Sequence, residues 1–152
     1  MKALISDRLM IDDPPVSIGG GDRRDDILHS ALGSCLTLDV EHDSTTLYTG
    51  SVRVFGEKFW ATFCFFDNRL TRVDLELLVD SADERNPFSE EVIESAKRNH
   101  DAILADALGP VPHAYSWGTI DSAIDPHGSG ARIVITYTPS RQHQVPNGSG
   151  MT

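Results

Sequence analysis

Hydrophobic and polar residues alternate through the middle of the chain in the pattern of β-strands. In FWATFCFF, residues 59–66, one face collects Phe59, Ala61, Phe63 and Phe65, and the other collects Trp60, Thr62, Cys64 and Phe66. Asp67-Asn68 is typical of a tight turn, and a returning strand over 70–79 is predicted after it. In that strand Arg72, Asp74 and Glu76 alternate with apolar residues, so we expect one face of the sheet to meet water.

The same patterns predict the remaining elements. Further strands are expected over 3–11, 36–40, 47–54, about 113–124 and 130–138. A short helix is predicted from the N-cap Asp22 to the terminating Gly33. A long helix is predicted from Ser89 to Gly109-Pro110, with one apolar stripe made of Val92, Ile93, Ala96, His100, Ile103, Leu104, Ala107 and Leu108.

This order of elements indicates an α+β protein. We expect a mainly antiparallel sheet of about six strands, with one short and one long helix packed on it. The chain of 152 residues fits one domain, over 1–138. Residues 139–152 lack a core-forming pattern and are expected to be a disordered tail.

Two segments could be mistaken for ligand sites. WGTIDSAIDPHGSGARIVITY, residues 117–137, contains Asp121, Asp125 and His127, which could hold a divalent ion if the chain bent sharply. The interpretation we favour is a hairpin, in which Asp-Pro and the following glycines form the turn. The second segment, Gly19-Gly20-Gly21, precedes a helix but lacks a phosphate-binding spacing, so a flexible connection is expected.

The cysteines and histidines do not assemble into a predicted catalytic set. Cys35 follows the C-terminal end of the first predicted helix, which does not activate a thiol, and Cys64 is expected to be a buried structural thiol. His100 is expected at the core or its boundary. No cofactor or metal is predicted. No signal peptide or membrane-spanning stretch is recognised, so we expect a reduced, cytoplasmic protein.

Charge is the most informative feature for function. The net charge of −10 argues against non-specific nucleic-acid binding. Residues 74–106 hold ten acidic and three basic residues, and therefore carry −7 of that charge. We hypothesise an acidic docking surface on the loop before the long helix and on the helix itself, made of Asp80, Asp83, Glu84, Glu90, Glu91, Glu94 and Asp101.

FFDNRLTRVDLEL and YSWGTIDSAIDPHGSGARIVITY resemble a pattern in small uncharacterised bacterial α+β proteins, some of which act as immunity proteins beside secreted toxins. The resemblance implies a binding role and carries no catalytic residues. Our leading hypothesis is a non-catalytic acidic protein that inhibits a basic protein toxin. The alternatives are a small metal- or ligand-binding enzyme that uses Asp121, Asp125 and His127, and a structural homodimer built on a face such as that of Trp60 and Phe66.

Overall fold

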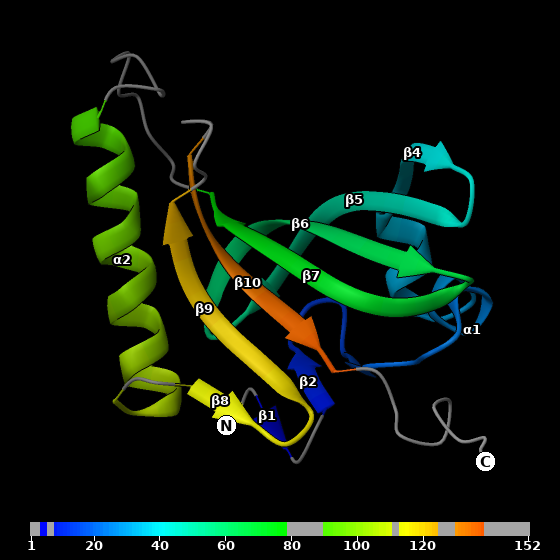
Figure 1. Ribbon diagram of the computed structural model, residues 1–152, viewed down its shortest axis with the longest axis horizontal. Coiled ribbons are helices and arrows are strands. Elements are labelled where there is room, and N and C mark those ends of the chain that lie inside the picture. The colour runs from blue at the N-terminus through cyan, green and yellow to red at the C-terminus, as the bar shows by residue number, and fades with distance from the viewer. Residues whose placement is uncertain (1–3, 6–7, 79–89, 111–112, 125–129, 139–152) are drawn as a thin grey trace, which may run out of the picture.

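The computed structural model describes residues 4–5, 8–78, 90–110, 113–124 and 130–138. Its strands form a three-stranded sheet, β1-β2-β3, and a seven-stranded sheet, β4-β5-β6-β7-β10-β9-β8 (Figure 1). All pairings are antiparallel. In chain order the elements are β1 (Leu4–Ile5), β2 (Arg8–Ile11), β3 (Val16–Gly19), α1 (Arg24–Leu28), the 3-10 helix η1 (Ala31–Cys35), β4 (Thr37–His42), β5 (Thr45–Val54), β6 (Glu57–Phe66), β7 (Arg69–Leu77), α2 (Glu90–Leu108), β8 (His113–Tyr115), β9 (Gly118–Ile124) and β10 (Ala131–Tyr137).

The α+β class and the antiparallel pairing are confirmed, but the large sheet has seven strands rather than about six. The difference comes from the segment predicted as one strand over 113–124. That segment folds back on itself, so that His113 pairs with Ile120 and Tyr115 with Gly118. Gly118 has a φ of 155° and lies against the Thr136 carbonyl, where a Cβ would collide. Glycine is therefore required at the turn between β8 and β9.

The N-terminal prediction was incomplete. The single strand expected over 3–11 is divided into β1 and β2, and β3 follows after Pro14-Pro15. The missed strand, VSIG, is too short to show a period, yet it pairs in register with β2 from Ile11↔Val16 to Arg8↔Gly19. These strands form a small separate sheet that contributes Leu9, Ile11 and Ile18 to the core.

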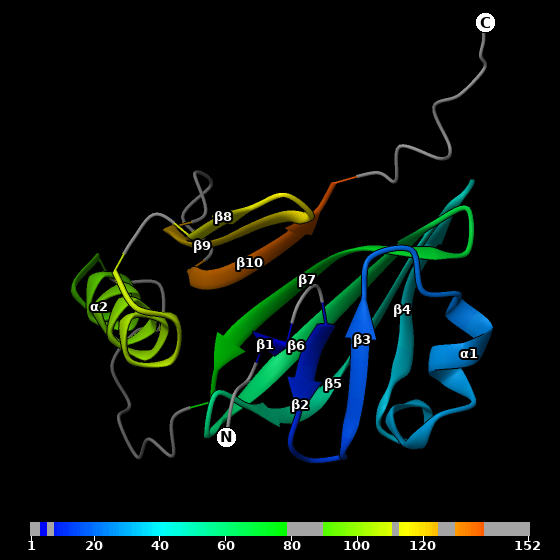
Figure 2. The ribbon, with the colours of Figure 1, turned by 90° about the horizontal axis from the view of Figure 1, so that it is seen from below.

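Alternation along β6 divides the large sheet into two faces, as predicted. Phe59, Phe63 and Phe65 are fully buried, whereas Trp60 and Phe66 remain 44% and 54% exposed. The buried face is covered in two places: the small sheet lies beside β5, and α2 lies against β9 and β10 (Figure 2). The second face, here called the open face, carries Trp60 and Phe66 of β6 and Asp74 and Glu76 of β7.

The first helix differs from its prediction. It begins at Arg24 and has only five residues, after which Ser30 caps η1 by accepting a hydrogen bond from the Leu32 N–H. Gly33 does not end a helix; it lies within η1, where a Cβ would collide with the Leu28 carbonyl. Gly33 therefore allows η1 to pack closely against the Leu28 carbonyl. It was predicted to end the helix instead.

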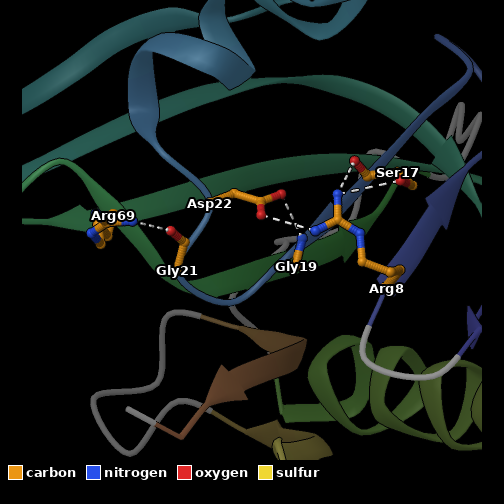
Figure 3. A network of polar contacts seen from close by, with 6 residues as sticks. All are labelled: Arg8, Ser17, Gly19, Gly21, Asp22 and Arg69. Carbon is orange, nitrogen blue, oxygen red and sulfur yellow. Dashed lines mark hydrogen bonds and ion pairs between the residues drawn. The ribbon is translucent and has the colours of Figure 1, made fainter. Parts of the chain in front are cut away.

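Asp22 is not the helix N-cap either, because its carboxylate forms hydrogen bonds with β2 and with the end of β3 (Figure 3). It accepts hydrogen bonds from the Gly19 N–H and from Arg8 on β2, both at 2.9 Å. Arg69 on β7 donates to the Gly21 carbonyl at 2.9 Å, and the Gly21 N–H donates to the Leu70 carbonyl. The triple-glycine segment, predicted to be a flexible connection, is thus bonded to both sheets.

One edge of the large sheet is formed by β4, all six of whose residues are exposed. Its pairing with β5 is interrupted by a register shift between Leu38 and Val40, which leaves Asp39 as the extra residue. β4 begins at Thr37, which pairs with Thr49, so β4 does not pair with the rest of β5. In that part of β5, Arg53 forms an isolated bridge with Asp13.

Candidate functional site: the outer surface of the long helix

The long helix α2 is fixed to the sheet along one side. Ile93, His100 and Leu104 are buried beneath it, which confirms the predicted apolar stripe in its central part. Gly109, at a φ of 89°, ends the helix and donates its N–H to the Ala105 carbonyl, as expected of a C-terminal glycine. The predicted cap Ser89 lies outside the described residues.

His100 attaches the helix to the sheet by a polar contact within this apolar stripe. Its Nε2 accepts a hydrogen bond of 3.2 Å from the Leu77 N–H at the end of β7, and its ring lies 6.3 Å from that of Phe59. Burial lowers the pKa of His100 because it disfavours the imidazolium; Asp101 opposes this shift and Lys97 adds to it. The lowered pKa favours the neutral imidazole, the form that accepts this hydrogen bond in the core.

The opposite side of α2 faces outward and is rich in carboxylates. Glu91, Glu94, Asp101 and Asp106 are exposed, and the helix as a whole has five acidic and two basic residues, a net charge of −3. Lys97 binds Asp101 one turn later through both carboxylate oxygens, at 3.2 and 3.0 Å. The outer surface of α2, defined by Glu91, Glu94, Asp101 and Asp106, is the part of the predicted acidic surface that the structure describes.

Asp101 is held by an ion pair with Lys97 on the same helix. Partial burial by itself would raise the pKa of Asp101, but interactions with the Ser122 hydroxyl and the Lys97 ammonium outweigh it and hold the pKa below its usual value. The carboxylate therefore stays ionised at neutral pH.

The other predicted acidic residues are distributed differently. Asp80, Asp83 and Glu84 lie outside the described residues, and Glu90 is the first residue of α2. Asp74 and Glu76, the first acidic residues of the stretch 74–106, lie on β7 and not on α2.

Asp74 and Glu76 instead project from the open face of β7. Asp74 is clamped by Arg72, at 2.7 and 3.0 Å, and contacts Arg132 of β10 at 3.5 Å. The charge of Asp74 is therefore offset by two arginines on the open face rather than presented beside α2.

The loop considered as a metal site is only partly described. Asp121 is exposed in β9 and pairs in register with Val134, within the hairpin that was predicted, whereas Asp125 and His127 lie outside the described residues. Within the described ranges, no group of three His, Cys, Asp or Glu side chains could hold a metal ion. The hypothesis of a metal or catalytic loop remains a prediction.

Two features of the cysteines were not anticipated. Cys64 was expected to be buried, but it is only half-buried, because it shares the open face with Trp60 and Phe66. Cys35 is exposed at the end of η1, beside a shallow pocket. The alternation in FWATFCFF already placed Cys64 opposite the buried phenylalanines and was the available signal for its exposure.

None of the helices in the described part of the chain is long and apolar enough to cross a membrane. Comparison with known proteins found no matching family model, no matching curated protein and no matching solved structure, so a function has to be argued from the residues of this chain.

Proposed function

We propose that this chain is a non-catalytic binding protein that captures a basic protein, of the kind inhibited by a toxin-immunity protein, through the outer surface of α2. The observation that carries the proposal is the one-sided attachment of this helix. Its apolar stripe is used by the sheet, while Glu91, Glu94, Asp101 and Asp106 face away from the core.

The geometry supports docking rather than chemistry at this surface. The carboxylates project from a regular helix that is fixed at Ile93, His100 and Leu104, so they are held in place before a partner arrives. Such preorganisation reduces the entropy lost on binding, and a field of one sign speeds the approach of an oppositely charged protein.

The test measures binding to the purified product of the adjacent gene, which the proposal requires to be a basic protein. Association rates are measured by stopped flow at several salt concentrations for the wild type and for a Glu91→Lys, Glu94→Lys double variant. We expect the variant to associate at least about tenfold more slowly at low salt, with the difference shrinking as salt is added.

A matched control separates local from overall electrostatics. Asp39→Lys with Glu41→Lys makes the same charge change on the exposed edge strand β4, away from α2. We expect this control to associate nearly as fast as the wild type. Equal slowing in both variants, or no complex with the neighbouring protein, would overturn the proposal.

A further inference from the structure

A pocket of about 250 Å³ lies beside the part of β5 that does not pair with β4. Its walls come from four separate parts of the chain: the Asp13-Pro14 segment, the end of η1, β5 and β6. The lining residues are Asp13, Pro14, Cys35, Ser51, Val52, Arg53 and Lys58. This pocket is separate from the outer surface of α2, and the function proposed above makes no use of it.

The arrangement of charge in this pocket is unusual for so acidic a chain. Arg53 and Lys58 are paired directly across β5 and β6, and like charges at such a position destabilise a sheet. Among the described residues neither side chain forms an ion pair with a carboxylate; Arg53 donates only to the Gly56 carbonyl, at 3.3 Å. The lining carries two cations and one acid, in a protein of net charge −10.

An anion bound between these two cations would remove their repulsion and use donors that have no carboxylate partner. Ser51 and Cys35 also line the pocket, and their side chains are of types that can donate hydrogen bonds. The volume is below the roughly 300–1,000 Å³ typical of pockets that enclose drug-sized ligands, so a compact group fits it better than an extended molecule.

We propose that this pocket binds a small oxyanion, the phosphate or carboxylate group of a small molecule, with Arg53 and Lys58 as its cationic ligands. Guanidinium and ammonium groups are the side chains that recognise such groups in proteins. Asp13 is the one acidic residue of the lining, and its carboxylate favours ligands that also carry a hydrogen-bond donor.

Cys35 provides a direct reporter, because it is exposed on the wall of the pocket. In a Cys64→Ser background its alkylation rate is measured with iodoacetate, which carries a carboxylate, and with iodoacetamide, which is neutral. An anion-binding pocket concentrates the charged reagent, so the ratio of the two rates reports the pocket's affinity for oxyanions independently of the thiol's own reactivity.

We expect Arg53→Gln with Lys58→Gln to lower this ratio at least about threefold, while Lys97→Gln with Arg98→Gln, which removes two cations from α2, leaves it nearly unchanged. Inorganic phosphate and acetate are each titrated as competitors. Saturable slowing of the iodoacetate reaction by phosphate alone, by acetate alone or by both supports the site and identifies the preferred oxyanion.

Two results would overturn the proposal: an equal ratio in both double variants, or slowing by both anions that follows ionic strength without saturation. Arg53 and Lys58 are exposed side chains whose strands pair through their backbones, so folding of the variant is expected and is checked by circular dichroism.

Discussion

His100 of α2 accepts a hydrogen bond from the backbone N–H of Leu77, the last residue of β7. The bond joins two elements that are separated in the chain by the segment 78–89, and it uses the neutral imidazole as the acceptor. A protonated ring has no lone pair at Nε2, so protonation and this contact are mutually exclusive.

The first prediction therefore concerns pH. Because the pKa of His100 is lowered in the folded protein, the unfolded chain binds more protons as the pH falls below its ordinary value of about 6.5. The stability associated with neutral His100 is complete above that value and declines from there down to the lowered folded pKa. Urea unfolding between pH 7.5 and 5 measures the decline.

His100→Gln keeps a side chain that can accept the Leu77 hydrogen bond but cannot titrate. We expect the pH dependence to become shallower in this variant, while His42→Gln, at an exposed position of β4, leaves it close to that of the wild type. An unchanged slope in His100→Gln would contradict the assignment.

The second prediction tests how α2 is attached. Leu104 is 2% exposed and belongs to the main core cluster, so Leu104→Ala is expected to lower the free energy of unfolding by about 2–5 kcal/mol. Asp106→Ala, on the exposed side of the same helix, should change it by less than about 0.5 kcal/mol. Similar losses in the two variants would mean that this side of α2 is not packed against the core.

The third prediction concerns the loop between β3 and α1. Asp22→Ala removes the acceptor for the Gly19 N–H and for Arg8, and we expect a loss of about 1–3 kcal/mol, as for hydrogen bonds to charged groups. Asp26→Ala, an exposed acidic residue of α1, serves as the comparison. Equal thermal stability of the two variants would show that the Asp22 contacts are not stabilising.

The fourth prediction separates two reasons for retaining a glycine. Gly118 and Gly130 both have positive φ, at 155° and 131°, but only at Gly118 would a Cβ meet the backbone, at the Thr136 carbonyl. Gly118→Ala should therefore be destabilised more than Gly130→Ala, for which about 1–3 kcal/mol is expected from backbone strain alone. The reverse order in denaturant melts would contradict the close approach.

Long periodic segments were predicted well from sequence because their signal repeats. The eight-residue alternation of 59–66 and the apolar stripe from Val92 to Leu108 each sample their period several times; the alternation was confirmed, and the stripe was confirmed at Ile93, His100 and Leu104. The strand Val16–Gly19 and the short strand β8 hold too few residues to repeat a pattern, so only the partner strand reveals them.

Glycine and aspartate were misread where tertiary contacts decide their role. Gly33 was read as a terminator, although it permits close packing on Leu28, and Asp22 was read as a cap, although it binds Arg8 from a distant strand. The predicted site shows the same limit. Charge along the sequence identified the acidic side of α2, but only the fold shows that Arg132 of β10 lies beside Asp74 of β7.

The shifted register of β4 has a consequence for how this molecule behaves among its own copies. A sheet ending in a flat, regular strand offers its free backbone groups to the next chain and invites fibril growth. Here Asp39 is the extra residue of an interrupted ladder, and Asp39, Glu41 and His42 place ionisable side chains along that boundary. At this boundary the interruption and the charges together discourage addition of an eighth strand from another copy, so growth of the sheet beyond β4 is disfavoured.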